Sequence, residues 1–110
     1  MIEYEKLKLK VEHESVELRL WGNSMYPSLC QGEMIRVTHI DWRDLKVGDI
    51  ILIYNKYLNN YICHRIVDIR LHIKHGFLFY TKGDNSTCID HRVTPQHIIG
   101  KVEIAKNGYS

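Results

Sequence analysis

The chain has 110 residues, of which 45% are hydrophobic and 25% are charged, and its formal net charge is +2. This length and composition indicate one globular domain that can bury a core without covalent cross-links. The small net charge, with no block of five or more Lys or Arg residues, argues against a nucleic-acid partner. No apolar run approaches the roughly 20 residues of a membrane-spanning helix, and the charged N-terminus is not typical of a secretory signal.

In the first half of the chain, residues 2–13 fit a helical face in part and an alternating strand in part, and we favour a short helix. Apolar and charged residues alternate over 16–20, which predicts a half-buried strand. A second strand is expected over 34–38 after a polar turn. The apolar run 50–54 is typical of a strand that is covered on both faces.

In the second half, a hairpin leads into a strand over 61–69, and the chain is expected to stay extended over 70–75. A partner strand over 77–80, a turn over 83–86 and a last strand over 100–104 follow. Many short strands with polar turns predict an all-β fold, a small, partly closed barrel of mostly antiparallel strands. We expect a single domain over 1–110, with residues 1–13 as a helical lead-in and a mobile tail after Lys106.

The three cysteines, Cys30, Cys63 and Cys88, are odd in number and show no paired spacing. They predict no disulfide framework and favour a reducing compartment, so we expect a cytoplasmic location. No cofactor is predicted. His72 and His75 have no nearby cysteine or carboxylate pattern, so no metal site is predicted either. The sequence does not indicate the oligomeric state.

Three residues carry the candidate chemistry, in the order serine, histidine, aspartate. Ser24 lies in a turn between an alternating strand and a proline, and a serine hydroxyl needs a base before it can act as a nucleophile. His64 lies in an apolar, strand-like run, and Asp84 and Asp90 follow another such run. Each also has a simpler interpretation: a turn hydroxyl, a packed core histidine, and aspartates that bond to the backbone of a turn. The remaining histidines are expected at the surface: His13, His39, His91 and His97.

Several segments together resemble the signal peptidases and the related self-cleaving repressor peptidases. The matching segments are GNSMYPSLCQGE, KVGDIILIY, CHRIV, TKGDNSTCID and IIGKV, which together cover roughly residues 16–104. Signal peptidases typically carry a membrane anchor, whereas no such segment is recognised here. The commoner bacterial enzymes and the repressors use lysine as base. No lysine stands at the matched position, so the resemblance is closest to the branch with a Ser-His-Asp triad.

The resemblance implies a serine endopeptidase in which Ser24 is the nucleophile, His64 the general base and Asp90 the residue that orients the imidazolium. Asp84 is then expected to hold the acidic turn by accepting backbone N–H bonds. Met25 and Tyr26 flank the nucleophile and are candidate substrate-binding residues, although Met25 also fits a packing role.

The oxyanion of the reaction is expected to meet the backbone N–H of Ser24. Many relatives add a serine hydroxyl two positions before the nucleophile, but Gly22 occupies that position here. Asn23 would supply a second donor only with its side chain turned inward.

The implied substrate is an extended peptide or protein segment, a leader- or signal-like sequence, with small residues just before the cut and two positions earlier. A membrane-associated partner could supply an anchor. Two alternatives remain open: a regulatory module like the C-terminal part of a self-cleaving repressor, and a non-catalytic scaffold that binds peptides. The lack of a helix-turn-helix segment and of a base lysine counts against the regulatory module.

Overall fold

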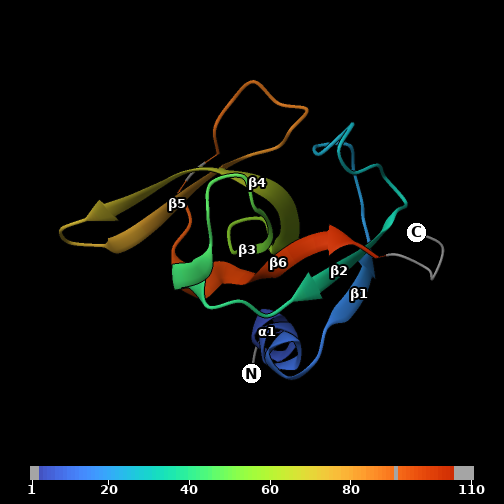
Figure 1. Ribbon diagram of the computed structural model, residues 1–110, viewed down its shortest axis with the longest axis horizontal. Coiled ribbons are helices and arrows are strands. Elements are labelled where there is room, and N and C mark those ends of the chain that lie inside the picture. The colour runs from blue at the N-terminus through green and yellow to red at the C-terminus, as the bar shows by residue number, and fades with distance from the viewer. Residues whose placement is uncertain (1–2, 91, 106–110) are drawn as a thin grey trace.

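The computed structural model describes residues 3–90 and 92–105. Figure 1 shows its elements in chain order: α1 (Glu3–His13), β1 (Val16–Arg19), β2 (Met34–Thr38), η1 (Trp42–Asp44), β3 (Ile50–Asn55), β4 (Asn60–His72), β5 (Gly76–Lys82), η2 (Pro95–His97) and β6 (Ile98–Ile104). The all-β prediction is confirmed, as is the short N-terminal helix. The tail expected to be mobile lies outside the described residues, and so does His91.

One six-stranded sheet, in the order β1-β2-β6-β3-β4-β5, contains all the strands, and every neighbouring pair is antiparallel. The sheet curls without closing. Backbone hydrogen bonds of 2.9 and 2.8 Å join Phe79 of β5 to Val93, and η2 then returns the chain to β6. This arrangement is consistent with the partly closed barrel that the sequence predicts (Figure 1).

Two apolar cores lie on opposite faces of β3, as expected for an unbroken apolar run. Leu52 packs in the first core, beneath α1, whereas Ile51 and Ile53 pack in the second. The first core holds Val11, Leu20, Met25, Leu29, Ile35, Val37, Leu52, Cys63, Ile99 and Val102. The second holds Leu45, Ile51, Ile53, Ile66, Phe79 and Ile98.

The β4–β5 hairpin projects from the body of the molecule (Figure 1). The two strands pair from Arg65↔Lys82 to His72↔Gly76, with an irregularity in the register between Ile66 and Asp68. Extra residues at such a point bend a strand and increase its twist, which turns the hairpin away from the sheet. Within the described residues, no helix has the length and apolar character needed to cross a membrane.

Candidate active site

Ser24 lies in a loop, residues 20–33, whose two ends are joined by backbone hydrogen bonds. At its base, the Leu20 N–H donates to the Glu33 carbonyl at 2.8 Å, and the Gly32 N–H donates to the Leu20 carbonyl at 2.9 Å. Met25 is fully buried in the first core, so it anchors the turn from below while Ser24 stays exposed. The 20–33 loop therefore places the Ser24 hydroxyl at the surface, on a backbone that the first core holds in place.

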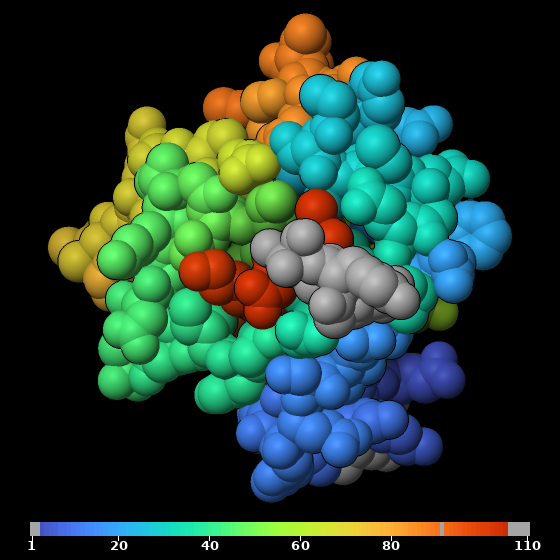
Figure 2. Space-filling view, turned by 45° about the vertical axis from the view of Figure 1, so that its right-hand side comes forward, coloured from blue at the N-terminus to red at the C-terminus, as the bar shows by residue number. Residues whose placement is uncertain are grey.

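The loop after β5 is hydrogen-bonded to the serine turn. The Asn85 N–H donates to the Ser24 carbonyl at 2.9 Å, and Asn85 Nδ2 donates to the Asn23 carbonyl at 3.2 Å. The Asp84 N–H contacts Met25 Sδ at 3.5 Å. Figure 2 shows the two segments side by side, the serine turn in cyan and the 83–90 loop in orange. Segments about sixty positions apart in the chain thus form one surface.

Gly83 is the point at which the serine and the histidine meet. A Cβ at this residue would lie 2.6 Å from the Ser24 carbonyl oxygen, 3.2 Å from Ser24 Cβ and 3.1 Å from His64 Nε2. Ser24 and the imidazole therefore border the same small space, which stays open because residue 83 has no side chain. Among the described residues, no hydrogen bond joins Ser24 Oγ to His64 Nε2. Catalytic hydrogen bonds are often long before a substrate binds.

The other ring nitrogen of His64 bonds to the predicted acid. His64 Nδ1 pairs with Asp90 Oδ2, and the Thr81 hydroxyl donates to the same oxygen at 3.0 Å. The His64 side chain is only 12% exposed, and Thr81 is the one buried polar side chain among the described residues. With Nδ1 bonded to Asp90, the other ring nitrogen, Nε2, lies on the side of Gly83 and Ser24, which is the arrangement that a general base needs.

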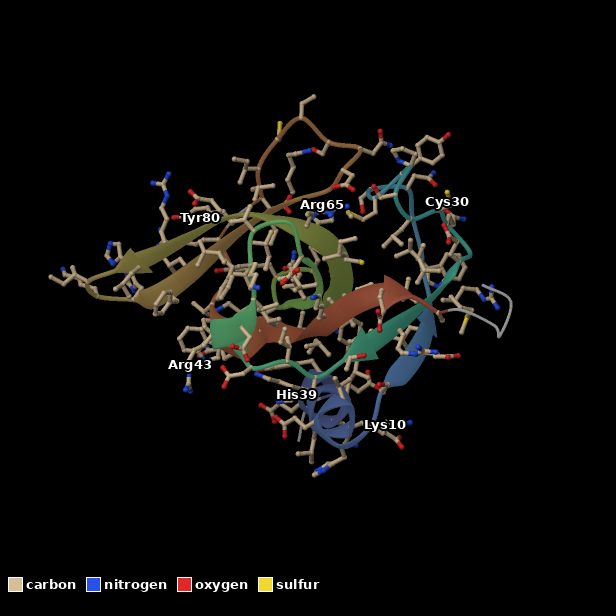
Figure 3. The ribbon with its side chains drawn as sticks, in the orientation of Figure 1. Lys10, Cys30, His39, Arg43, Arg65 and Tyr80 are labelled. Carbon is tan, nitrogen blue, oxygen red and sulfur yellow. The ribbon has the colours of Figure 1, made fainter. Side chains whose placement is uncertain are left out.

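Asp84 has a different set of partners from the one that turn chemistry predicts. Its carboxylate accepts from Arg65 Nε at 2.9 Å and from Arg65 Nη2 at 2.8 Å, rather than from the backbone of its turn. The hydrogen bonds from Arg65 lower the pKa of Asp84, opposed by burial and assisted by Ser28. Arg65 Nη1 also donates to the Gly48 carbonyl at 2.7 Å. Arg65, labelled in Figure 3, therefore ties β4 to two loops.

The remaining predicted site residues lie beside the nucleophile but differ in exposure. Tyr26 is 53% exposed next to Ser24, whereas Met25 has no exposed surface. The Asn23 side chain is exposed and its carbonyl accepts from Asn85, so nothing in the fold turns that side chain inward. The Ser24 N–H has no acceptor among the described residues, which leaves it free to donate to a substrate.

Cys63 and the other histidines have surroundings that differ from those of His64. Burial raises the pKa of Cys63 to about 12, with Asp84 adding to the rise and Arg65 opposing it, so this thiol stays protonated at neutral pH. His97, expected at the surface, is half-buried and its Nδ1 lies 3.1 Å from the Thr94 hydroxyl. The rings of His72 and His75 stack at 4.7 Å. The described residues contain no group of three or more side chains suited to a metal ion.

Sequence reasoning missed Thr81, Gly83 and the pairing role of Arg65. Thr81 and Gly83 both belong to the segment TKGD, which lies in the acidic segment of the resemblance but whose local pattern predicts only a strand end and a turn. Comparison with known proteins found no matching family model and no matching curated protein.

Proposed function

We propose that this protein is a serine endopeptidase with a Ser24-His64-Asp90 triad, similar in its chemistry to the histidine-using signal peptidases. The observation that carries the proposal is the convergence at Gly83 of Ser24 Cβ and His64 Nε2, while His64 Nδ1 pairs with Asp90. Three residues from separate segments thus stand in the order nucleophile, base, orienting acid.

In the proposed reaction, Ser24 Oγ attacks the scissile carbonyl carbon as His64 Nε2 takes the hydroxyl proton. The negative charge that forms on the carbonyl oxygen is met by the free N–H of Ser24. The C–N bond then breaks and the imidazolium gives its proton to the leaving amine. A water molecule, deprotonated by His64, hydrolyses the resulting ester and releases the second product.

An extended peptide is the substrate that suits the sheet beside this triad. The pairing of β4 with β5 begins at Arg65, so among the described residues the outer edge of positions 60–63 has no strand partner. Such an edge offers free N–H and C=O groups to an added strand, and it leads directly to His64. A leader- or signal-like segment of a peptide or protein fits this mode of binding.

On one side of this strand edge the protein is densely packed, which favours small substrate side chains there. Met25 and Cys63 lie in the first core beside the Ser24 turn, with 0% and 6% of their surfaces exposed. Substrate residues that point toward them meet filled space, which supports small residues just before the cut and two positions earlier. All three cysteines are free thiols, which supports a reducing compartment such as the cytoplasm as the place of action.

The direct test is covalent labelling with a serine-directed fluorophosphonate probe, read by intact mass. The wild-type chain is expected to gain one probe adduct, and Ser24→Ala is expected to gain none. Ser15→Ala is the matched control, because Ser15 is an exposed serine before β1, outside the 20–33 loop that carries Ser24. Labelling that persists in Ser24→Ala, or a wild type that stays unlabelled while folded, would contradict the proposal in favour of a peptide-binding scaffold.

A further inference from the structure

A cleft of about 360 Å³ opens at the mouth of the partly closed barrel, next to the triad. It begins at Asp90 and Thr81, the acid and its hydroxyl partner, and extends toward the turn that joins β3 to β4. Neither Ser24 nor His64 lines it. The cleft is thus a neighbour of the catalytic groups and has no part in the proposed chemistry. Barrel mouths of this kind are common places for ligands to bind.

The lining of the cleft combines an apolar floor with a positively charged rim. Ile53, Ile62 and Val93 form the floor, and Lys56 and Arg92 stand at the rim. Among the described residues, neither of these two cations has a carboxylate partner within ion-pair distance. Asp90, the acidic residue of the lining, is already bonded to His64 and Thr81. The rim therefore offers positive charge that no described carboxylate neutralises.

A second observation agrees with the positive character of the cleft. His97 also lines it, and the pKa of His97 is lowered, first by burial and then by the charges of Lys56 and Lys8. A cation disfavours the protonated form of an imidazole only when the two groups are close enough for their charges to repel each other. Lys56 therefore lies close enough to His97 for its charge to act across this side of the cleft, where an anionic group would be attracted.

The geometry of β4 directs one substrate side chain toward this cleft. Side chains alternate between the two faces of a strand, so Ile62 and His64 share one face while Cys63 lies on the other. A peptide paired with the free edge of positions 60–63 has the same alternation, and its residue opposite Ile62 points to the face of the cleft. The residues on either side of it point to the closed face that contains Cys63.

We propose that the cleft is a substrate subsite for an acidic side chain, with glutamate as the best fit. This subsite rests on the proposed function, since it takes the residue that lies between the two small residues preceding the cut. The methylene groups of glutamate lie on the apolar floor, and its carboxylate meets Lys56 and Arg92. Tyr57, 84% exposed at the rim with Lys56 Nζ 5.4 Å from its ring centre, flanks the entrance.

The test is cleavage of paired peptides that differ only by Glu or Gln at the position between the two small residues. We expect the wild type to cleave the Glu peptide about fivefold faster in kcat/KM or more, with the difference shrinking as salt screens the rim. The double variant Lys56→Glu with Arg92→Glu should lose this preference and favour Lys at that position. Lys74→Glu, a charge reversal at the remote hairpin tip, is the matched control and should keep the wild-type preference. Equal rates for the two peptides, or a preference that survives the double reversal, would overturn the subsite.

Binding of the same peptides to Ser24→Ala separates failure of the subsite from failure of the proposed function. This variant needs no chemistry, so fluorescence anisotropy of labelled Glu and Gln peptides reports the cleft alone. Tighter binding of the Glu peptide, abolished when Lys56 and Arg92 are reversed in the same background, supports the subsite even if no peptide is cut. Equal affinities overturn it even if the wild type proves to be a peptidase.

Discussion

The two halves of β4 have the same backbone conformation but different surroundings. Residues 60–65 pair with β3, and side chains along this half alternate between the two cores, with Cys63 in the first and Ile66, just beyond the pairing, in the second. Residues 68–72 pair only with β5 and end in solvent, where Leu71 is 71% exposed. His64 in the inner half is bonded to Asp90 of a distant segment, whereas His72 in the outer half stacks on His75 and accepts from the Lys74 N–H, both within its own hairpin turn. A strand can therefore prepare a histidine for catalysis only where other segments pack around it.

The inner half of β4 should carry the whole reaction through His64. Ser24→Ala and His64→Ala should each lower kcat on the order of 10⁴-fold or more, and the double variant should be little worse, because groups that act as a unit are not additive. Rates on a cleavable peptide, with circular dichroism to show an intact fold, measure this. Substantial activity in either single variant would remove the proposed pair from the mechanism.

Asp90 should show the next largest effect, through the orientation of His64. Asp90→Asn keeps the size of the side chain but cannot hold the imidazolium, so kcat should fall by about 10² to 10⁴-fold with little change in thermal stability. Thr81 donates to the same oxygen and would remain bonded to the amide oxygen. A rate close to wild type would assign the orienting role to another carboxylate.

Gly83→Ala tests the close approach between the inner half of β4 and the serine turn. The added methyl would lie 2.6 Å from the Ser24 carbonyl, a backbone atom, so the turn must move away from His64. A displacement near 1 Å costs about 10²-fold in rate, and we expect a loss of kcat of about this size. Thr87→Ala, exposed in the same loop, is the control. Equal rates in the two variants would show that Gly83 does not set the distance between the two groups.

Asp84→Asn should affect stability more than rate. Because hydrogen bonds from Arg65 hold the pKa of Asp84 below its ordinary value of 3.8, its ionised form stabilises the fold at neutral pH. That contribution is present above about pH 4 and is lost as pH falls through the lowered pKa. We expect Asp84→Asn to lower the free energy of unfolding by about 1 to 2 kcal/mol at pH 7. Denaturant titrations should show that the deficit shrinks as the pH falls below about 4, and a deficit that is constant with pH would point to a cause other than this ion pair.

The elements that the sequence predicted correctly are those that a local pattern determines. The alternation over 16–20, the apolar run 50–54 and the turn at 83–86 each carry their own periodicity or turn chemistry, and each formed the expected element. The choice of helix for residues 2–13, of which 3–13 are described, was harder, since both periods fitted in part. The helix places Val11 in the first core, and this burial favours the helix over a strand.

The contacts that assemble the site could not be read from local pattern. Turn chemistry predicted that Asp84 would bond to its own backbone, but the guanidinium of Arg65 offers a bidentate, charge-assisted pair that is stronger. Nothing local to Gly83 indicates that Ser24 approaches it, because the two lie far apart in the chain. The expectation that the serine, histidine and aspartate segments assemble came from their resemblance to the signal peptidases and from their serial order, not from local pattern.

The outer half of β4 should tolerate change with almost no effect on the reaction, and this is the smallest effect we predict. Ile73 is 97% exposed, and the stacked rings of His72 and His75 contact neither core. Replacing both histidines by glutamine removes the stacking and the bond that His72 Nδ1 accepts from the Lys74 N–H, yet leaves the pairing of β4 with β5 in place. We expect kcat/KM on a short peptide to change by less than about twofold, as is usual for exposed substitutions away from a site. A loss of tenfold or more would mean that the hairpin tip contacts the substrate, and the division of β4 into a catalytic and a non-catalytic half would then fail.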